Sequence, residues 1–268
     1  MPDFPPNAVA FITGAASGIG LAVARQLIID GVTNLALLDL SFPSLSSAKE
    51  TLSSLSENIT ILLLPNNVSS EAEVDHAMAQ TIQKFGRIDL CFNAAGIAGE
   101  WTGTADMQTE NLDKVLGVNL KGLWFCERAE LRQFLKQEER DVCTGIPFKT
   151  RGSIVNVGSI ASRFGLPNTG SYVMAKHGVL GLTRTDSSTY AAQGIRINCI
   201  CPGFIDTPML ESVLERDNDI KHSIFARTPV ARVGHPAEVA YTATFLLSDR
   251  ASFITGAGID VDGGWSSF

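Results

Sequence analysis

The sequence predicts an α/β protein of one domain, residues 1–268, with a doubly wound parallel sheet between two layers of helices. The chain has 268 residues, of which 45% are hydrophobic, enough to bury one large core. Its short apolar runs show almost no polar alternation, as is typical of strands buried on both faces. Because these runs alternate with longer segments of helical character, we expect right-handed βαβ units and a parallel sheet.

Seven runs rich in Val, Ile and Leu are the expected strands, at residues 9–12, 35–38, 59–64, 90–92, 154–157, 195–200 and 259–261. The expected helices between them cover residues 18–29, 70–85, 111–137, 171–193 and 236–247. The polar stretch 138–151 carries Gly145 and Pro147 and is interpreted as a surface loop. Residues 204–230 follow a Pro-Gly turn and are too long for a simple connection, so we expect a substrate lid inserted there.

The charge balance indicates the class of partner. A net charge of -7 argues against nucleic acid and against an anionic membrane surface, because both would repel the chain. No apolar run approaches the length of a membrane span, and the N-terminus lacks the basic region of a signal peptide. We therefore expect a cytoplasmic protein that acts on a small molecule.

The cysteines and histidines suggest neither disulfides nor a metal. The five cysteines are odd in number and form no C-x-x-C pair. Cys199 and Cys201 are expected to face the same side of one strand, in the core. The four histidines show no metal-ligand spacing, so no metal is expected.

A glycine-rich turn joins the first expected strand to the first helix. Gly14 would permit the tight turn, Gly18 the approach of backbone to a pyrophosphate, and Gly20 the close packing of helix on sheet. The helix start, with Ser17 and Ile19, would present free N-H groups to the phosphates. Glycines also serve in ordinary turns, but this strand and helix context favours a dinucleotide site of the Rossmann fold.

Asp39 ends the second expected strand, where an acidic side chain can accept both hydroxyl hydrogens of the adenosine ribose. A 2'-phosphate there would meet like charge, and neither the glycine turn nor Leu40 and Ser41 offer a cation to neutralise it. The sequence therefore favours NAD(H) over NADP(H). The alternative is that Asp39 only caps the following segment.

Three polar residues indicate the chemistry. Tyr172 and Lys176 are four residues apart at the opening of a helix, so they share one face. Ser159 follows a strand at the carboxyl edge of the sheet, where ligands of open α/β sheets bind. Tyr172 would exchange a proton with the substrate oxygen, and the Lys176 ammonium would lower the pKa of its phenol. Ser159 would hold the substrate oxygen.

At these residues the chain resembles the short-chain dehydrogenase/reductase family over residues 9–264. The matching motifs are the turn Thr13-Gly14-x-x-x-Gly18-Ile19-Gly20, Asn93-Ala94-Ala95-Gly96, Asn119, Ser159, Tyr172-x-x-x-Lys176 and Pro202-Gly203-Phe204-Ile205-Asp206-Thr207. The resemblance implies a catalytic tetrad of Asn119, Ser159, Tyr172 and Lys176. Asn119 would hold a water that relays protons from Lys176.

The resemblance also implies further cofactor contacts. Asn93 would line the adenosine ribose, and Lys176 would bond the nicotinamide ribose. The other implied contacts are Ala94, Gly96, Tyr172, Pro202, Gly203, Ile205, Thr207, Asn67 and Val68. Asn67 stands where many members have aspartate, so its amide oxygen would accept the adenine hydrogen bond without the charge.

The resulting hypothesis is an NAD-dependent oxidoreductase that acts on a secondary alcohol or ketone of a small, lipophilic or cyclic metabolite. One alternative is a non-redox reaction on the same fold, by an epimerase, a dehydratase or a pericyclic catalyst. Another is a dinucleotide-sensing protein without turnover. Family members are commonly tetramers or dimers, so a homo-oligomer is expected, and the apolar stretch 116–125 is compatible with an interface or with core packing.

Overall fold

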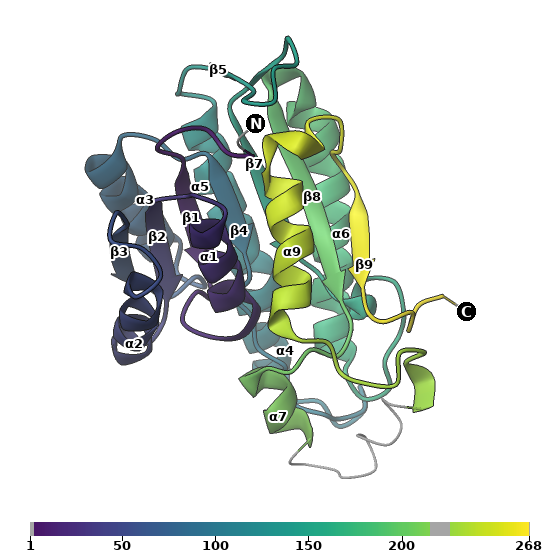
Figure 1. Cartoon of the computed structure of the whole chain (residues 1–268). Coiled ribbons are helices and arrows are strands. Elements are labelled where there is room, and N and C mark those ends of the chain that lie inside the picture. Colours follow the sequence, from purple (N-terminus) through teal and green to yellow (C-terminus); the bar gives the residue numbers. More distant parts are fainter. Residues whose placement is uncertain (1–2, 215–225, 268) are drawn as a thin grey trace.

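The computed structural model describes residues 3–214 and 226–267 and shows one parallel sheet between two layers of helices (Figure 1). The sheet has seven strands in the order β3-β2-β1-β4-β7-β8-β9. Every neighbouring pair in it is parallel. The predicted fold class, a doubly wound α/β fold of the Rossmann type in a single domain, is therefore confirmed.

All seven predicted strands are present, and their ends differ from the prediction by at most two residues. Every residue of β1 and β7 is buried, whereas β3 and β9 at the sheet edges are only partly buried. Burial on both faces explains why the central strands read as unbroken apolar runs. The strands are β1 (Val9–Thr13), β2 (Asn34–Asp39), β3 (Thr60–Pro65), β4 (Leu90–Asn93), β7 (Gly152–Val157), β8 (Ile195–Pro202) and β9 (Gly258–Val261).

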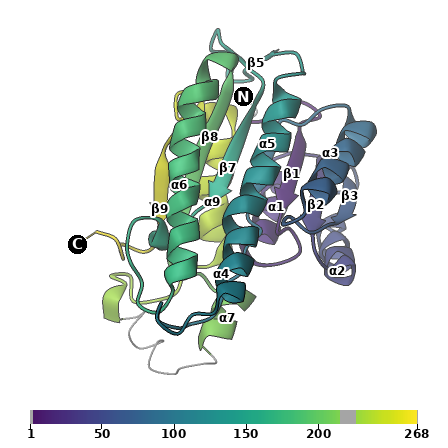
Figure 2. The same ribbon diagram turned by 180° about the vertical axis from the view of Figure 1, so that it is seen from behind.

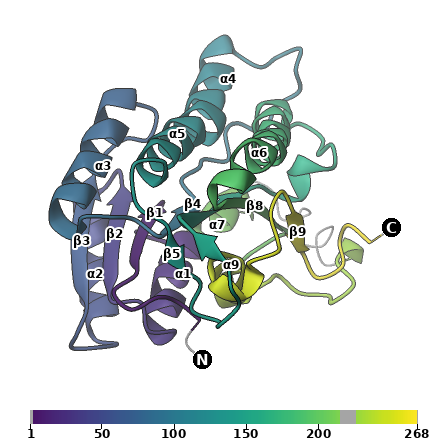
Figure 3. The ribbon, with the colours of Figure 1, turned by 90° about the horizontal axis from the view of Figure 1, so that it is seen from above.

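Helices cover both faces of the sheet. One face carries α1 (Gly18–Ile29), α2 (Phe42–Ser53) and α9 (Pro236–Leu247), which lie in front in Figure 1. The other face carries α3 (Glu71–Phe85), α5 (Leu123–Phe134) and α6 (Gly170–Tyr190), as the reverse view shows (Figure 2). Seen from above, the sheet runs between these two layers (Figure 3). The helix α2 was not predicted, although Ser41 caps it by accepting a bond from the Ser44 amide at 3.3 Å.

The predicted helix over residues 111–137 is present as one continuous helical segment, but it begins at Thr109 and ends at Phe134. The segment contains α4 (Thr109–Leu116), a π-helical stretch (Gly117–Gly122) and α5, which ends at Phe134. Within the π-helical stretch, the Asn119 side chain donates to the Ile97 carbonyl and accepts from the Ile97 amide, both at 2.8 Å. This pair of bonds stabilises the wide turn of the π-helical stretch. Such π-helical turns often occur at functional positions.

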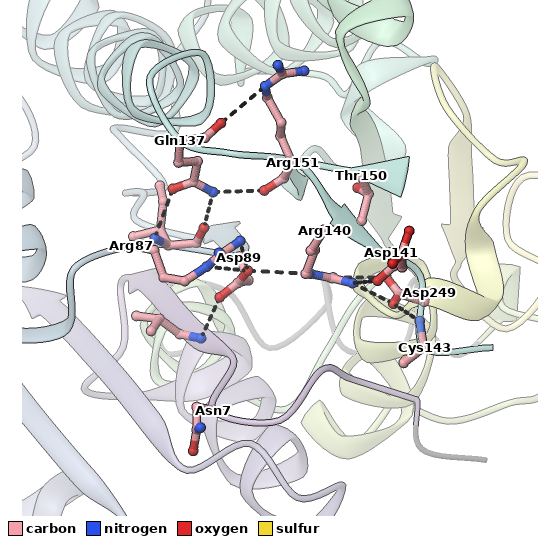
Figure 4. A network of polar contacts seen from close by, with 12 residues as sticks. Asn7, Arg87, Asp89, Gln137, Arg140, Asp141, Cys143, Thr150, Arg151 and Asp249 are labelled. Atoms are coloured by element: carbon pink, nitrogen blue, oxygen red, sulfur yellow. Dashed lines mark hydrogen bonds and ion pairs between the residues drawn. The ribbon is translucent and has the colours of Figure 1, made fainter. Parts of the chain in front are cut away.

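The polar stretch 138–151, predicted as a surface loop, contains secondary structure that the sequence does not indicate. It contains a short antiparallel pair, β5 (Arg140–Asp141) and β6 (Lys149–Thr150). The Arg140 guanidinium donates to both carboxylate oxygens of Asp249, at 2.7 and 3.0 Å, and lies 3.5 Å from Asp89 (Figure 4). Asp89 immediately precedes β4, so this network anchors the pair at the amino ends of the strands. Sequence patterns do not reveal such a pair of strands, because residues far away in the sequence hold it in place.

The predicted lid begins at the opposite, carboxyl end of the sheet. Its described part contains α7 (Pro208–Leu214), which follows β8. Residues 215–225, which belong to the predicted lid, lie outside the described residues. No helix in the described ranges combines the length and the apolar character needed to cross a bilayer.

Candidate active site

A cavity of about 570 Å³ opens at the carboxyl ends of β1, β2, β4, β7 and β8. Ligands of open α/β sheets bind at this edge. The cavity brings together all the predicted site residues except Asn93 and Asn119. Those that line it are Gly14, Ser17, Gly18, Ile19, Gly20, Asp39, Asn67, Val68, Ala94, Gly96, Ser159, Tyr172, Lys176, Pro202, Gly203, Ile205 and Thr207.

The glycine turn forms a cradle that side chains would fill. Gly14 has a φ of +65°, and a Cβ atom there would lie 2.8 Å from the Ala95 amide nitrogen. A Cβ atom on Gly20 would lie 2.1 Å from the Gly14 carbonyl oxygen. The Ser17 side chain makes no capping bond to α1, so the first-turn amides of this helix are free to face an anionic group. The residues therefore fit the pyrophosphate of a dinucleotide.

Asp39 ends β2 beside this turn. Its Oδ2 accepts a bond from the Ala16 amide at 3.0 Å, and its Oδ1 accepts from the Leu40 amide at 2.8 Å. An ionised carboxylate has about four acceptor positions, so both oxygens retain capacity for a ligand hydroxyl. Asp39 thus shapes the glycine turn and also faces the cavity.

Asn67 lines the cavity with its amide oxygen already engaged. That Oδ1 accepts bonds from the Ser69 amide at 3.0 Å and from the Ser69 hydroxyl at 2.8 Å. The Asn67 backbone amide in turn donates to Glu73 at 2.8 Å. The side chain therefore organises its own turn, and its oxygen has less capacity for an adenine hydrogen bond than the sequence alone suggests.

Asn93 lies in the core instead of the cavity. Its Nδ2 donates to Glu130 at 3.0 Å and to the Asn156 side chain at 3.1 Å. Asn156 in turn donates to Glu127, so two buried carboxyl groups of α5 meet the ends of β4 and β7. Burial raises the pKa of Glu130 to about 8, although its bond from Asn93 lowers it in part. This cluster joins β4, β7 and α5 beneath the site. The sequence gives no signal for its two carboxyl groups, those of Glu127 and Glu130.

Ser159, Tyr172 and Lys176 meet at the centre of the cavity. Ser159 follows β7, and its hydroxyl accepts from the Ala161 amide at 3.1 Å, while its side chain also lowers the pKa of Tyr172. Tyr172 and Lys176 lie one turn apart near the start of α6, with Lys176 Nζ 5.6 Å from the centroid of the Tyr172 ring. The ammonium donates to the Val157 carbonyl at 2.7 Å, which fixes it against β7.

The pKa values of the pair follow from their burial. Burial raises the pKa of Tyr172 above its ordinary value, and the bond from Ser159 lowers it in part. Burial lowers the pKa of Lys176 to about 8, against the charges of Cys199 and Cys201, which raise it. Lys176 is not among the causes of the raised pKa of Tyr172, so the expectation that its ammonium lowers this pKa stays a prediction. Desolvation is the largest cause of the shift.

Asn119 is fully buried behind the cavity wall. Its amide holds the Ile97 backbone, and a Cβ atom on Gly96 would lie 3.3 Å from Asn119 Oδ1 and 3.9 Å from Lys176 Nζ. Gly96 therefore lies between Asn119 and Lys176. Asn119 therefore shapes the loop that follows β4, next to Lys176.

Beyond Tyr172, loops that follow β4, β7 and β8 line what we call the substrate end of the cavity. Four of the residues named below, Phe204, Met209, Leu210 and Val213, fall in the lid predicted at residues 204–230. The sequence gives no signal for the others, because irregular loops carry no periodic pattern. The residues of these segments that line this end include Glu100, Trp101, Leu166, Pro167, Phe204, Met209, Leu210 and Val213.

The described residues offer no metal site, since they contain no group of three or more His, Cys, Asp or Glu side chains able to hold an ion. Cys199 and Cys201 are buried as expected, with their sulfur atoms 3.9 Å apart.

Comparison with known proteins gives consistent matches along the chain. Residues 14–266 match a family model described as enoyl-(acyl carrier protein) reductase. Levodione reductase of Leifsonia aquatica is 34% identical over 97% of this chain and 94% of its own. Cyclohexanol dehydrogenase of an Acinetobacter species is 35% identical over 97% of this chain and 96% of its own.

Solved structures agree with these sequence matches. The crystal structure of levodione reductase superposes with a TM-score of 0.90 at 35% identity, and covers 97% of this chain and 98% of its own. A variant of actinorhodin polyketide ketoreductase, solved with NADPH, superposes with a TM-score of 0.86 at 28% identity and covers 98% of both chains.

Proposed function

Because this chain belongs to the short-chain dehydrogenase/reductase family, we propose that it transfers a hydride between NAD(H) and a secondary alcohol or ketone. The convergence of Ser159, Tyr172 and Lys176 beside the glycine turn is the observation that carries this proposal. A bound nicotinamide supplies the hydride acceptor or donor. The side chains then need only to hold the substrate oxygen and move its proton.

Each polar side chain has a distinct part in the proposed reaction. The Ser159 hydroxyl, which lines the cavity together with Tyr172, orients the substrate oxygen. The Tyr172 hydroxyl takes the proton of the alcohol during oxidation and returns it during reduction. Lys176 holds its ammonium close to the Tyr172 ring and favours the phenolate as the proton leaves. We propose that Asn119 supports this relay by fixing the Ile97 backbone beside Lys176.

The preference for NAD(H) is the finer part of the proposal, and Asp39 supports it. Among the described residues that line the cavity, only Asp39, Glu100 and Lys176 carry charge. Lys176 lies at the chemical centre, so no described cation lies beside Asp39 to pair a 2'-phosphate. The polyketide ketoreductase relative was solved with NADPH, so the fold itself does not decide the cofactor.

We further propose a small, cyclic, lipophilic substrate. The substrate end is mostly apolar, and one similar protein is named as acting on cyclohexanol. Residues 204–230 would act as a lid over this end, since α7 contributes Met209, Leu210 and Val213 to its wall. A homo-oligomer in the cytoplasm is our expectation, and the exposure of Trp124 on α5 is compatible with an interface.

The experiment that tests the function follows the absorbance of reduced nicotinamide with cyclic alcohols and ketones. We expect NAD reduction by at least one cyclic secondary alcohol, and loss of that turnover in Tyr172→Phe. Cofactor binding with isomerisation or elimination but no net redox change would favour a non-redox reaction. Cofactor binding without any turnover would favour a dinucleotide sensor.

A further inference from the structure

Glu100 lies at the substrate end of the cavity, in a wall that is otherwise apolar or uncharged. The described residues that line this end include Trp101, Met209 and Leu210, and among them Glu100 alone is charged. Because the rest of the described wall carries no charge, a substrate group that lies beside Glu100 meets a single negative charge.

The loop that carries Glu100 is held in place by contacts on both sides. The Glu100 amide donates to the Asn111 side chain at 3.2 Å. Gly99 has a φ of +77°, and a Cβ atom there would lie 2.6 Å from a methyl carbon of Val115. Farther along, the Thr102 amide donates to the Asn168 carbonyl at 2.9 Å. The backbone on either side of Glu100 is therefore held in place where the residue lines the cavity.

The Glu100 carboxylate is not engaged in an ion pair within the described part of the chain, whose ion pairs all involve other acidic residues. It is also exposed, so its charge is hydrated before a substrate binds. An anionic substrate group beside it would meet like charge as water leaves. A hydroxyl group on the substrate would instead donate a charge-assisted hydrogen bond to it.

We propose that Glu100 is a specificity-determining residue that selects substrates by charge. It favours cyclic ketones or alcohols that carry a hydroxyl group away from the reacting carbon. It rejects those that carry a carboxylate, phosphate or sulfonate group there. Trp101, which is 40% exposed and lines the cavity on the same loop, supplies apolar surface for the rest of such a substrate. This inference rests on the proposed function and deepens it.

The test compares three cyclohexanones that differ only in the group opposite the carbonyl, which is methyl, hydroxyl or carboxylate. Each is reduced with NADH by the wild-type protein, by Glu100→Gln and by Glu110→Gln. Glu110 is a matched control, since it is an exposed carboxylate near the start of α4 that does not line the cavity. The readout is kcat/KM for the hydroxyl compound divided by kcat/KM for the carboxylate compound.

We expect this ratio to fall about tenfold in Glu100→Gln, as repulsion between two nearby charges in a partly desolvated site predicts. It should stay within about twofold of wild type in Glu110→Gln, and the methyl compound should change little in either variant. Added salt should also reduce the wild-type ratio, because ions screen exposed charges. An unchanged ratio in Glu100→Gln, with the methyl compound still reduced, overturns this inference alone. Absence of reduction of all three compounds by the wild type, at any NADH or NADPH concentration, overturns the proposed function as well.

Discussion

The carboxylate of Asp39 accepts a hydrogen bond from the Ala16 amide at 3.0 Å. The residue expected to recognise the adenosine ribose therefore also holds the glycine turn that faces the pyrophosphate. Its removal affects the shape of the cofactor site as well as the charge.

Replacement of Asp39 with Ser and Leu40 with Arg should admit NADP and weaken NAD. The new guanidinium would pair with the 2'-phosphate, while the ribose hydroxyls lose their carboxylate acceptor. We expect the ratio of kcat/KM for NADP to that for NAD to rise by about a hundredfold, equivalent to two charge-assisted bonds of about 1.5 kcal/mol. The single variant Asp39→Asn is the control, because its amide oxygen can still accept the Ala16 bond. Equal use of both cofactors by the wild type would contradict the charge argument.

Tyr172→Phe should abolish most turnover and leave NAD binding close to normal. The substitution removes only the hydroxyl that moves the proton, and general acid-base catalysis typically contributes about 10² to 10⁴-fold. Steady-state kinetics and calorimetric titration with NAD measure the two effects separately. A variant that retains more than about a tenth of wild-type kcat would be incompatible with this role.

Met209→Ala should raise the Michaelis constant for the substrate with little change in NAD affinity. Met209 lies on α7 at the substrate end, is 37% exposed and reaches the cavity wall. Loss of its apolar contact area should weaken substrate binding by about fivefold to tenfold. The neighbouring substitution Ser212→Ala serves as control, since Ser212 is exposed on the same helix and does not line the cavity. Unchanged substrate kinetics would argue against the proposed lid.

Glu130→Gln should flatten the dependence of stability on pH. The folded-state pKa of Glu130 is about 8, above its ordinary value of 4.5, so the folded state keeps a proton that the unfolded state releases. The contribution of Glu130 to the free energy of unfolding should therefore be highest below about pH 4.5. It should fall as the pH rises from there toward about 8.

Glutamine cannot ionise and still accepts the bond from Asn93, so the variant should lose this part of the slope. Urea denaturation across this pH range measures the slope. The control is Glu138→Gln, which changes an exposed residue. Parallel curves for wild type and Glu130→Gln would show that Glu130 does not titrate between the two states.

Asp249→Ala should destabilise the fold without affecting catalysis. Asp249 is 4% exposed and accepts two bonds from Arg140 and one from the Cys143 amide (Figure 4). Removal of this carboxylate leaves the partly buried Arg140 guanidinium with only the more distant Asp89 as an ionic partner among the described residues, which costs about 3 kcal/mol. The network lies at the amino ends of the strands, far from the cavity, so kcat should hold at temperatures where the variant is folded.

A second ion pair provides the control. Arg250 is exposed and pairs with Asp3 at 2.7 Å, and an exposed pair of this kind contributes less than about 1 kcal/mol. Urea midpoints of Asp249→Ala and Arg250→Gln should therefore differ clearly. Equal midpoints would mean that the Arg140 network does not stabilise the fold.

The strand pattern and the site motifs were predictable because their signals are local. A strand buried on both faces must be apolar along its length, and this is why β1 and β7 were recognised without any tertiary information. The turn at Gly14 and the spacing of Tyr172 and Lys176 likewise depend on backbone geometry within a few residues. Helix α2 was missed although its cap at Ser41 is also local, because serines fill its polar face and weaken the apolar period.

Other features were decided only by contacts between distant segments. The Asn93 side chain meets Glu130 in the core, because the packing of α5 on β4 places a buried carboxyl group within its reach. The raised pKa of Tyr172 follows from the depth at which the loops enclose it, which no spacing of residues encodes. The sequence by itself determined which residues can carry the chemistry. The tertiary structure decided which of them face the cavity and how strongly water is excluded there, because burial and its electrostatic cost arise only when distant segments pack together.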